Sequence, residues 1–241
     1  MAELLGFEIV DTSFKAYVTK LIKKYEEGIK TVVVSGNPEV LYTALNDSEV
    51  KSLCIKSDII PDGIGVIISG KIARQHFEER IAGIDIMCSL LSYSGKSRAP
   101  IYMLGAKESI LKRAVDVCRK KYDADIVGCH NGYFDIDDCD DIIDDINKSN
   151  AGILFAAMGC PKQELFIARH MDKLNCSIFM GVGGSFDVLA GKVKRAPKWM
   201  INCGMEWLYR AVREPARILR LGVIPKFILI SLMYDKRKKD R

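Results

Sequence analysis

Short apolar runs alternate with helix-like stretches through residues 1–191, and this alternation restricts the fold more than any other feature of the chain. Runs such as ILFAA (153–157) and SIFMGV (177–182) are apolar rather than alternating, which is typical of strands covered on both faces. Alternating strands and helices predict a mainly parallel, doubly wound, Rossmann-like α/β sheet. The expected strands are Thr31–Ser35, Leu53–Ser57, Ile101–Leu104, Asp125–Gly128, Ile153–Ala157 and Ser177–Val182. The expected helices span 38–46 (with Asn37 as its N-cap), 106–121, 138–148 and 161–173.

Charge divides the chain into two unequal parts. Residues 1–191 hold 22 Lys+Arg against 27 Asp+Glu, whereas residues 192–241 hold 14 against 4. The corresponding net charges are −5 and +10, within a total of +5. We therefore expect an α/β domain over 1–191 with a ligand crevice, and a basic helical appendage over 192–241 that meets an anionic partner.

The appendage itself contains two kinds of segment. Trp199–Leu221 has the arginine-rich pattern of one or two amphipathic helices, and Val223–Tyr234 is a short apolar run that precedes a basic end. That run is too short to cross a bilayer, which needs about 20 residues, but it suits a position within an anionic membrane surface. The alternative is a terminal helix docked on the body or on a second subunit of a homo-oligomer.

Cysteine and histidine usage argues against a metal site. The eight cysteines form no CxxC, and the three histidines form no cluster with them. The nearest match to an acidic DxD motif is Asp138-Cys139-Asp140. We expect no metal and no cofactor. The N-terminus is acidic and does not resemble a secretory signal, so we expect reduced thiols and a cytoplasmic protein.

Six polar, glycine-containing turns follow the expected strands. Ligands of parallel α/β sheets gather at the carboxyl ends of strands, where glycine lets backbone N–H groups approach a phosphate. Each turn alone is a weak signal, but together they indicate a nucleotide-sized crevice without identifying a reaction. The turns span residues 35–39, 61–63, 104–106, 128–134, 159–164 and 181–187.

A family resemblance rests on the order of short motifs along residues 4–222. NPE, PDGIG, ERIAGID, GYF, GCPKQE, GVGGSFDVLAG, RAPKW and EWLYRAVREPARILR follow one another. In this order the chain resembles the WecG/TagA/CpsF glycosyltransferases. The resemblance implies inverting, metal-independent transfer of an N-acetylmannosamine-type sugar from a UDP donor to the 4-hydroxyl of undecaprenyl-diphosphate-GlcNAc, at the inner membrane face, for wall teichoic acid or a related surface polysaccharide.

The resemblance assigns the reacting centre to three residues. Asp62 matches the catalytic base, which takes the proton of the attacking hydroxyl. Ser35 matches a position usually held by threonine near the reacting centre. Arg80 can grip the donor diphosphate and stabilise the leaving UDP. Without the family pattern, Asp62 would be a turn residue and Arg80 a surface ion-pair partner of Glu78 or Glu79.

Substrate binding is assigned in the same way. Asn37, Tyr133, Gln163 and Asp187 match donor-binding positions, although Asn37 also suits a helix cap. Glu164 can equally orient Gln163 or cap the helix. The residues matching the acceptor-binding arginines are Arg210, Arg217 and Arg220, which with Arg213 share one helical face.

Two other classes of protein compete with this reading. GVGGS resembles the phosphate turn of dinucleotide-dependent oxidoreductases, but no βαβ unit with a ribose-binding acidic residue follows it. The arginine face also suits a non-catalytic anion or nucleic-acid binder, but aromatic residues are only 8% of the chain and are poorly interleaved with the basic ones. We therefore expect no nucleic acid partner. Transfer of a different UDP-hexose to a lipid-linked sugar remains an alternative.

Overall fold

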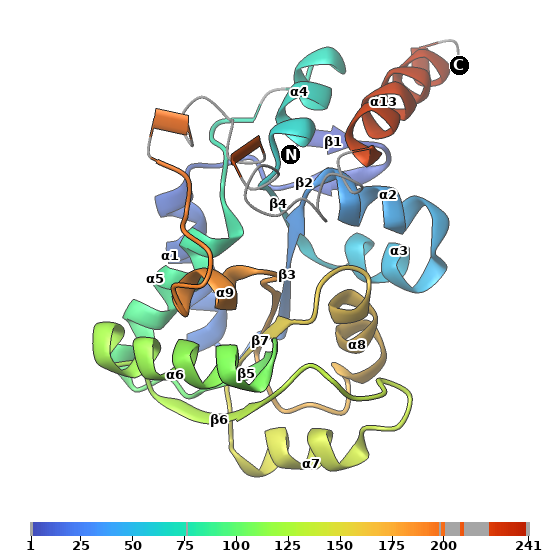
Figure 1. Cartoon of the computed structure of the whole chain (residues 1–241). Coiled ribbons are helices and arrows are strands. Elements are labelled where there is room, and N and C mark those ends of the chain that lie inside the picture. Colours follow the sequence, from blue (N-terminus) through green and yellow to red (C-terminus); the bar gives the residue numbers. More distant parts are fainter. Residues whose placement is uncertain (1, 76, 198, 201–207, 210–221, 240–241) are drawn as a thin grey trace.

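Eight strands form one sheet with helices on both faces (Figure 1). The structure, a computed structural model, describes residues 2–75, 77–197, 199–200, 208–209 and 222–239. The strands are β1 (Ala2–Leu4), β2 (Phe7–Ile9), β3 (Thr31–Gly36), β4 (Asp58–Pro61), β5 (Ile101–Gly105), β6 (Ile126–His130), β7 (Ile153–Ala157) and β8 (Ile178–Gly181). The helices are α1 (Phe14–Glu26), α2 (Pro38–Asn46), α3 (Ser48–Ile55), α4 (Ile64–Ile72), α5 (Gly83–Ser97), α6 (Glu108–Tyr122), α7 (Asp140–Lys148), α8 (Lys162–His170), α9 (Ser185–Leu189) and α13 (Val223–Lys239).

The sheet is parallel apart from one edge hairpin. Its strand order is β1-β2-β4-β3-β8-β7-β5-β6, and β1 pairs with β2 in the antiparallel sense. The predicted fold class is therefore confirmed. In the ladder between β3 and β4, Gly36 lies opposite Pro61, so the two strands end side by side. A Cβ on Gly36 would lie 2.6 Å from the backbone oxygen of Ile60, so this close pairing requires glycine.

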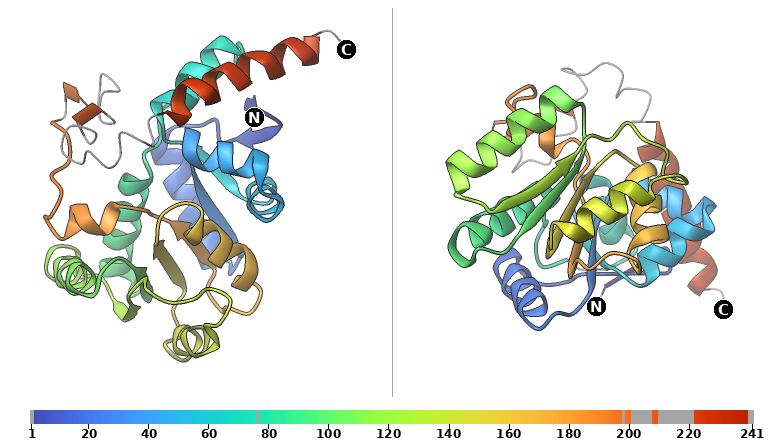
Figure 2. Two further views of the ribbon diagram at one scale, coloured as in Figure 1. Left: turned by 45° about the vertical axis from the view of Figure 1, so that its right-hand side comes forward. Right: turned by 90° about the horizontal axis from the view of Figure 1, so that it is seen from below.

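Each face of the sheet carries its own apolar layer. Val32 and Val34 of β3 pack into the layer that includes α2, α3, α7 and α8, whereas Val33 packs into the layer that includes α1, α5, α6 and α9. Figure 2 shows these two helix layers on either side of the sheet. Burial on both faces explains why the central strands β3, β5, β7 and β8 are largely apolar.

One predicted strand is wrong. Residues 53–55 close helix α3, and β4 begins only at Asp58. The Asp47 carboxylate caps that helix by accepting the backbone N–H groups of Glu49 (2.9 Å) and Val50 (3.0 Å). Val50, Leu53 and Cys54 then share a buried helical face, so a helical period over 47–55 replaces the expected strand.

The last helix, α13, docks on the body beside α4 and α2 (Figure 2). Phe227 is fully buried, and Ser231 donates its hydroxyl to the Phe227 carbonyl at 2.9 Å. The structure thus contains a docked terminal helix, and contact of this segment with a membrane surface stays a prediction. The helices expected within 199–221 lie almost wholly outside the described residues, and the boundary at 191/192 stays a prediction.

Candidate functional site

A cavity of about 310 Å³ opens where β3, β4, β7 and β8 end. Four of the six glycine-containing turns contribute to its wall, namely those within 35–39, 61–63, 159–164 and 181–187. The turns at 104–106 and 128–134 do not. Parallel strands bring their carboxyl ends to one edge, so turns far apart in sequence meet there. Of the predicted site residues, the cavity is lined by Ser35, Asn37, Asp62, Arg80 and Gln163.

Asp62 is held in a turn tied to the neighbouring strand. Its backbone N–H donates to the carbonyls of Ile60 (2.9 Å) and Gly36 (3.2 Å), and the Gly63 N–H also donates to Gly36 at 3.2 Å. The Asp62 side chain is one quarter exposed. Sheet hydrogen bonding thus fixes the turn while the carboxylate reaches the cavity.

Arg80 lies directly beside this carboxylate. Its Nε donates to the backbone oxygen of Asp62 at 2.5 Å, and its Nη2 is 3.6 Å from Asp62 Oδ1. Glu79 instead accepts the backbone N–H of Phe14 at 2.7 Å. The Arg80 guanidinium therefore belongs to the cavity wall with Asp62, where it can meet an anionic group of a ligand.

Gly83 is a site residue that sequence reasoning missed. A Cβ at this position would lie 2.5 Å from Ser35 Oγ and 3.5 Å from Asp62 Oδ2. The first turn of α5 therefore packs against the Ser35 hydroxyl, which a larger residue would displace, while the Asp62 carboxylate would stay in ordinary contact. Gly83 is part of the ERIAGID motif, but the need for glycine there becomes clear only when α5 is seen to pack against the end of β3.

Asn37 caps helix α2 and lines the cavity at once. Its Oδ1 accepts the N–H groups of Glu39 (3.0 Å) and Val40 (3.1 Å), and its Nδ2 donates to the Ser35 carbonyl at 3.1 Å. The predicted cap is confirmed. The amide thereby fixes the backbone between Ser35 and the start of α2, and donor contact by Asn37 stays a prediction.

Tyr133 and Asp187 are placed away from the cavity wall. The Tyr133 side chain is 71% exposed, in the loop that follows β6. The Asp187 carboxylate lies 2.9 Å from Lys192 Nζ, just beyond α9. The structure therefore does not bring these two residues together with the other five, and their donor-binding role stays a prediction. The predicted acceptor residues Arg210, Arg217 and Arg220 lie outside the described residues.

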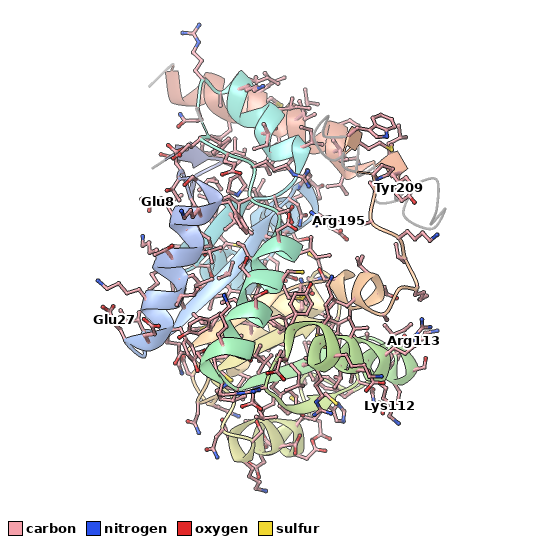
Figure 3. All side chains as sticks on the ribbon, turned by 90° about the vertical axis from the view of Figure 1, so that its left-hand side faces the viewer. Glu8, Glu27, Lys112, Arg113, Arg195 and Tyr209 are labelled. Atoms are coloured by element: carbon pink, nitrogen blue, oxygen red, sulfur yellow. The ribbon has the colours of Figure 1, made fainter. Side chains whose placement is uncertain are left out.

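The chain that follows α9 contacts first helix α5 and then, in α13, the cavity wall. Arg195 makes a two-pronged ion pair with Asp85 in the first turn of α5, with N–O distances of 2.5 and 2.7 Å, and Figure 3 shows Arg195 near the start of that helix. Later, Val223 and Ile224 of α13 supply an apolar part of the cavity wall. Sequence reasoning missed this wall because apolar residues near the C-terminus carry no signal of where they dock.

The described residues contain no group of three or more His, Cys, Asp or Glu side chains that could hold a metal ion. Within the Asp138-Cys139-Asp140 segment, the Cys139 thiol is buried and donates to the Ile136 carbonyl at 3.4 Å. The expectation of metal independence stays a prediction.

The fold and the site together define an α/β protein with a cavity at the carboxyl edge of a parallel sheet, lined by a carboxylate and a guanidinium. The model of the glycosyl transferase WecG/TagA/CpsF family matches residues 2–241. The chain belongs to this family of glycosyltransferases, which confirms the resemblance and excludes the oxidoreductase alternative.

Two curated relatives bear the name N-acetylglucosaminyldiphosphoundecaprenol N-acetyl-beta-D-mannosaminyltransferase. The protein of Bacillus subtilis (strain 168) is 34% identical over 233 residues, which covers 95% of this chain and 90% of the relative. The protein of Bacillus spizizenii (strain ATCC 23059 / NRRL B-14472 / W23) is 31% identical over 232 residues, with coverages of 95% and 90%.

Proposed function

We propose that this glycosyltransferase moves N-acetylmannosamine, with inversion, from a UDP donor to the 4-hydroxyl of GlcNAc-diphosphate-undecaprenol. The observation that carries the proposal is the meeting of Asp62, Arg80 and Ser35 in one strand-end cavity of a chain of this family. The names of the two Bacillus relatives supply the sugar and the lipid-linked acceptor. Wall teichoic acid or a related surface polysaccharide would be the product pathway.

The transfer needs a base on the acceptor and a counter-charge on the leaving group. The Asp62 carboxylate takes the proton of the GlcNAc hydroxyl as its oxygen attacks the anomeric carbon. The bond from that carbon to the donor diphosphate breaks, and its electron pair stays with UDP. The Arg80 guanidinium stabilises the negative charge that develops there. A single displacement of this kind inverts the anomeric configuration.

Membrane contact is supported by an apolar surface on α4 and α13. Its members, defined here as the α4–α13 surface, are Ile68, Ile72, Leu229, Leu232 and Met233, and all five are exposed. No helix in the described part of the chain is long and apolar enough to cross a bilayer. We therefore propose peripheral binding to the inner face of the cell membrane, with Arg210, Arg217 and Arg220 gripping the acceptor diphosphate.

An Ile68→Glu/Leu229→Glu double variant should lose most of its binding to anionic vesicles, because two carboxylates would have to enter the apolar layer. Co-flotation with phosphatidylglycerol vesicles measures the loss. Ile29→Glu is the matched control, since Ile29 is 46% exposed and precedes β3 at the amino edge of the sheet. Equal flotation of wild type and double variant would refute this surface as the membrane contact.

A Gly83→Ala variant should fold normally but transfer sugar no better than Ser35→Ala. The new methyl group displaces the serine hydroxyl, which can rotate away at little cost to stability. In a Ser35→Ala background the same change should cost little more, because the next atoms lie 3.4 and 3.5 Å away in ordinary contact. Initial rates and melting temperatures of the three variants measure this. Equal losses in both backgrounds would show that the methyl group acts on something other than Ser35.

The proposed function is tested by offering a panel of UDP-sugars with a short-chain GlcNAc-diphosphate-lipid. The panel contains the N-acetylmannosamine, N-acetylmannosaminuronic acid, N-acetylglucosamine and glucose donors, and mass spectrometry identifies the product. Transfer from UDP-N-acetylmannosamine with a β-linkage by NMR is the expected result. If only another UDP-hexose supports transfer, that sugar is the donor and the proposed one is wrong. Transfer abolished by EDTA would overturn metal independence.

A further inference from the structure

Helix α8 begins with two buried polar side chains, Gln163 in the cavity wall at 5% exposure and Glu164 next to it at 4% exposure. Buried polar groups are costly unless they are hydrogen-bonded. Their partners therefore show what the pair does. Glu164 has no part in the transfer described above, and sequence reasoning left open whether it orients Gln163 or caps the helix.

Gln163 ties two glycine loops together. Its Oε1 accepts the backbone N–H of Gly159 at 3.2 Å, in the loop after β7, and that of Gly183 at 3.1 Å, in the loop after β8. Both glycines line the cavity. Because one oxygen serves two N–H donors, the amide has a single useful orientation, with Nε2 pointing away from the loops.

The Glu164 carboxyl group accepts a hydrogen bond from that Nε2. The distance from Gln163 Nε2 to Glu164 Oε1 is 2.8 Å. A Cβ on Gly181, at the end of β8, would lie 2.6 Å from Gln163 Nε2 and 3.3 Å from Glu164 Oε1, so both groups pack directly on the strand backbone. The second oxygen, Oε2, is buried and makes no hydrogen bond within the described part of the chain.

The surroundings of Glu164 raise the pKa of its carboxyl group. Burial is the largest cause, and the charge of Glu39 on α2 acts in the same direction, while the Gln163 amide, the backbone of Glu164 and the Cys160 thiol act in the opposite direction. The other titratable groups that face it are the thiols of Cys54 on α3 and Cys160 before α8. In either protonation state the carboxyl group keeps an acceptor oxygen for Gln163.

We propose that Glu164 is a positioning residue, whose carboxyl group fixes the Gln163 amide and thereby the spacing of the two glycine loops that receive the donor. That these loops receive a UDP-sugar rests on the proposed function. The spacing of the loops is a property of the free protein and can be measured without any donor.

The first test is amide hydrogen exchange of the free protein. A Glu164→Met variant has a side chain of similar size but no acceptor, so the Gln163 amide loses its restraint. Exchange at the Gly159 and Gly183 N–H groups should become about tenfold faster, the effect of losing one buried hydrogen bond. Glu164→Gln keeps an acceptor oxygen and should exchange like wild type. Unchanged exchange in Glu164→Met would overturn the proposal.

The second test is a double-mutant cycle on the donor KM. Glu164→Met should raise the KM about tenfold with a smaller change in kcat, and should add little in a Gln163→Ala background, because it acts through that amide. Glu108→Met is the matched control, since Glu108 also lies in the first turn of a helix but is exposed. Losses that add in full would mean a merely structural role and would overturn the positioning role.

The two tests separate this inference from the proposed function. A wild-type protein that transfers no sugar from any UDP donor would remove the proposed function, and the exchange result would still decide whether Glu164 positions the loops. Conversely, normal transfer by the wild type with additive losses in the cycle would remove the inference alone.

Discussion

An Asp62→Asn variant is expected to transfer sugar about 10²–10⁴ times more slowly than wild type, the range for loss of a general base. Asparagine has nearly the same shape but cannot take the proton of the attacking hydroxyl. The turn should survive, because the contacts that hold it use backbone groups of residue 62, including the oxygen that accepts from Arg80 Nε. Donor binding should therefore stay near the wild-type value.

Initial rates with UDP-N-acetylmannosamine and calorimetric titration with UDP check both parts of this expectation. Asp116→Asn is a matched control, because Asp116 is exposed on α6 and lies outside the cavity wall. Wild-type turnover by Asp62→Asn would remove Asp62 as the base. A loss of UDP binding as large as the loss of rate would instead assign this carboxylate to the binding of the donor.

An Arg80→Ala variant is expected to lower kcat by about 10²–10³, the usual cost of removing one preorganised donor from a developing anion. The guanidinium lies in the cavity wall and contacts both the backbone oxygen and the carboxylate of Asp62. Its loss would remove the positive charge that stabilises the leaving UDP, and it would loosen the turn that holds Asp62. Arg80→Lys keeps the charge but loses the planar fork, so it should recover only part of the rate.

Rates for the two Arg80 variants, together with product inhibition by UDP, measure this effect. Weaker inhibition by UDP in Arg80→Ala is the expected sign that the guanidinium meets the diphosphate. Arg98→Ala is the control, since Arg98 also pairs with an aspartate, Asp123 at 2.8 Å, but on the exposed surface, where such pairs contribute little. Unchanged kcat and unchanged UDP inhibition in Arg80→Ala would contradict the assignment.

Local patterns predicted most of the sheet because strands buried on both faces are apolar at most positions. Thr31–Gly36 and Ile153–Ala157 are such strands. Asn37 followed by Pro38 predicted a helix start, because the asparagine side chain can cap the helix and proline suits its first turn. The same reasoning failed at residues 53–57, where a short apolar run fits strand and helix alike. It also passed over the antiparallel hairpin of β1 and β2, whose strands have three residues each.

The candidate site divides in the same way. Asp62, Ser35 and Arg80 were found through motif order, and the structure shows that they share one cavity. Sequence reasoning missed Gly83 because its role is to leave space beside Ser35 and Asp62, and only the tertiary structure shows that these residues are its neighbours. The sequence pointed to Glu164 as a partner of Gln163, but only the tertiary structure shows that it is buried and hydrogen-bonded to Gln163.

By itself, the sequence determined the fold class, the family and the chemistry that each turn can offer, because these depend on residue type and on order along the chain. The tertiary structure alone decided which of those turns meet. Strand order places β3, β4, β7 and β8 so that their ends enclose a cavity, and leaves Tyr133 and Asp187 outside its wall. It also brings Val223 and Ile224 to that wall from the far end of the chain, because packing joins residues without regard to their separation in sequence.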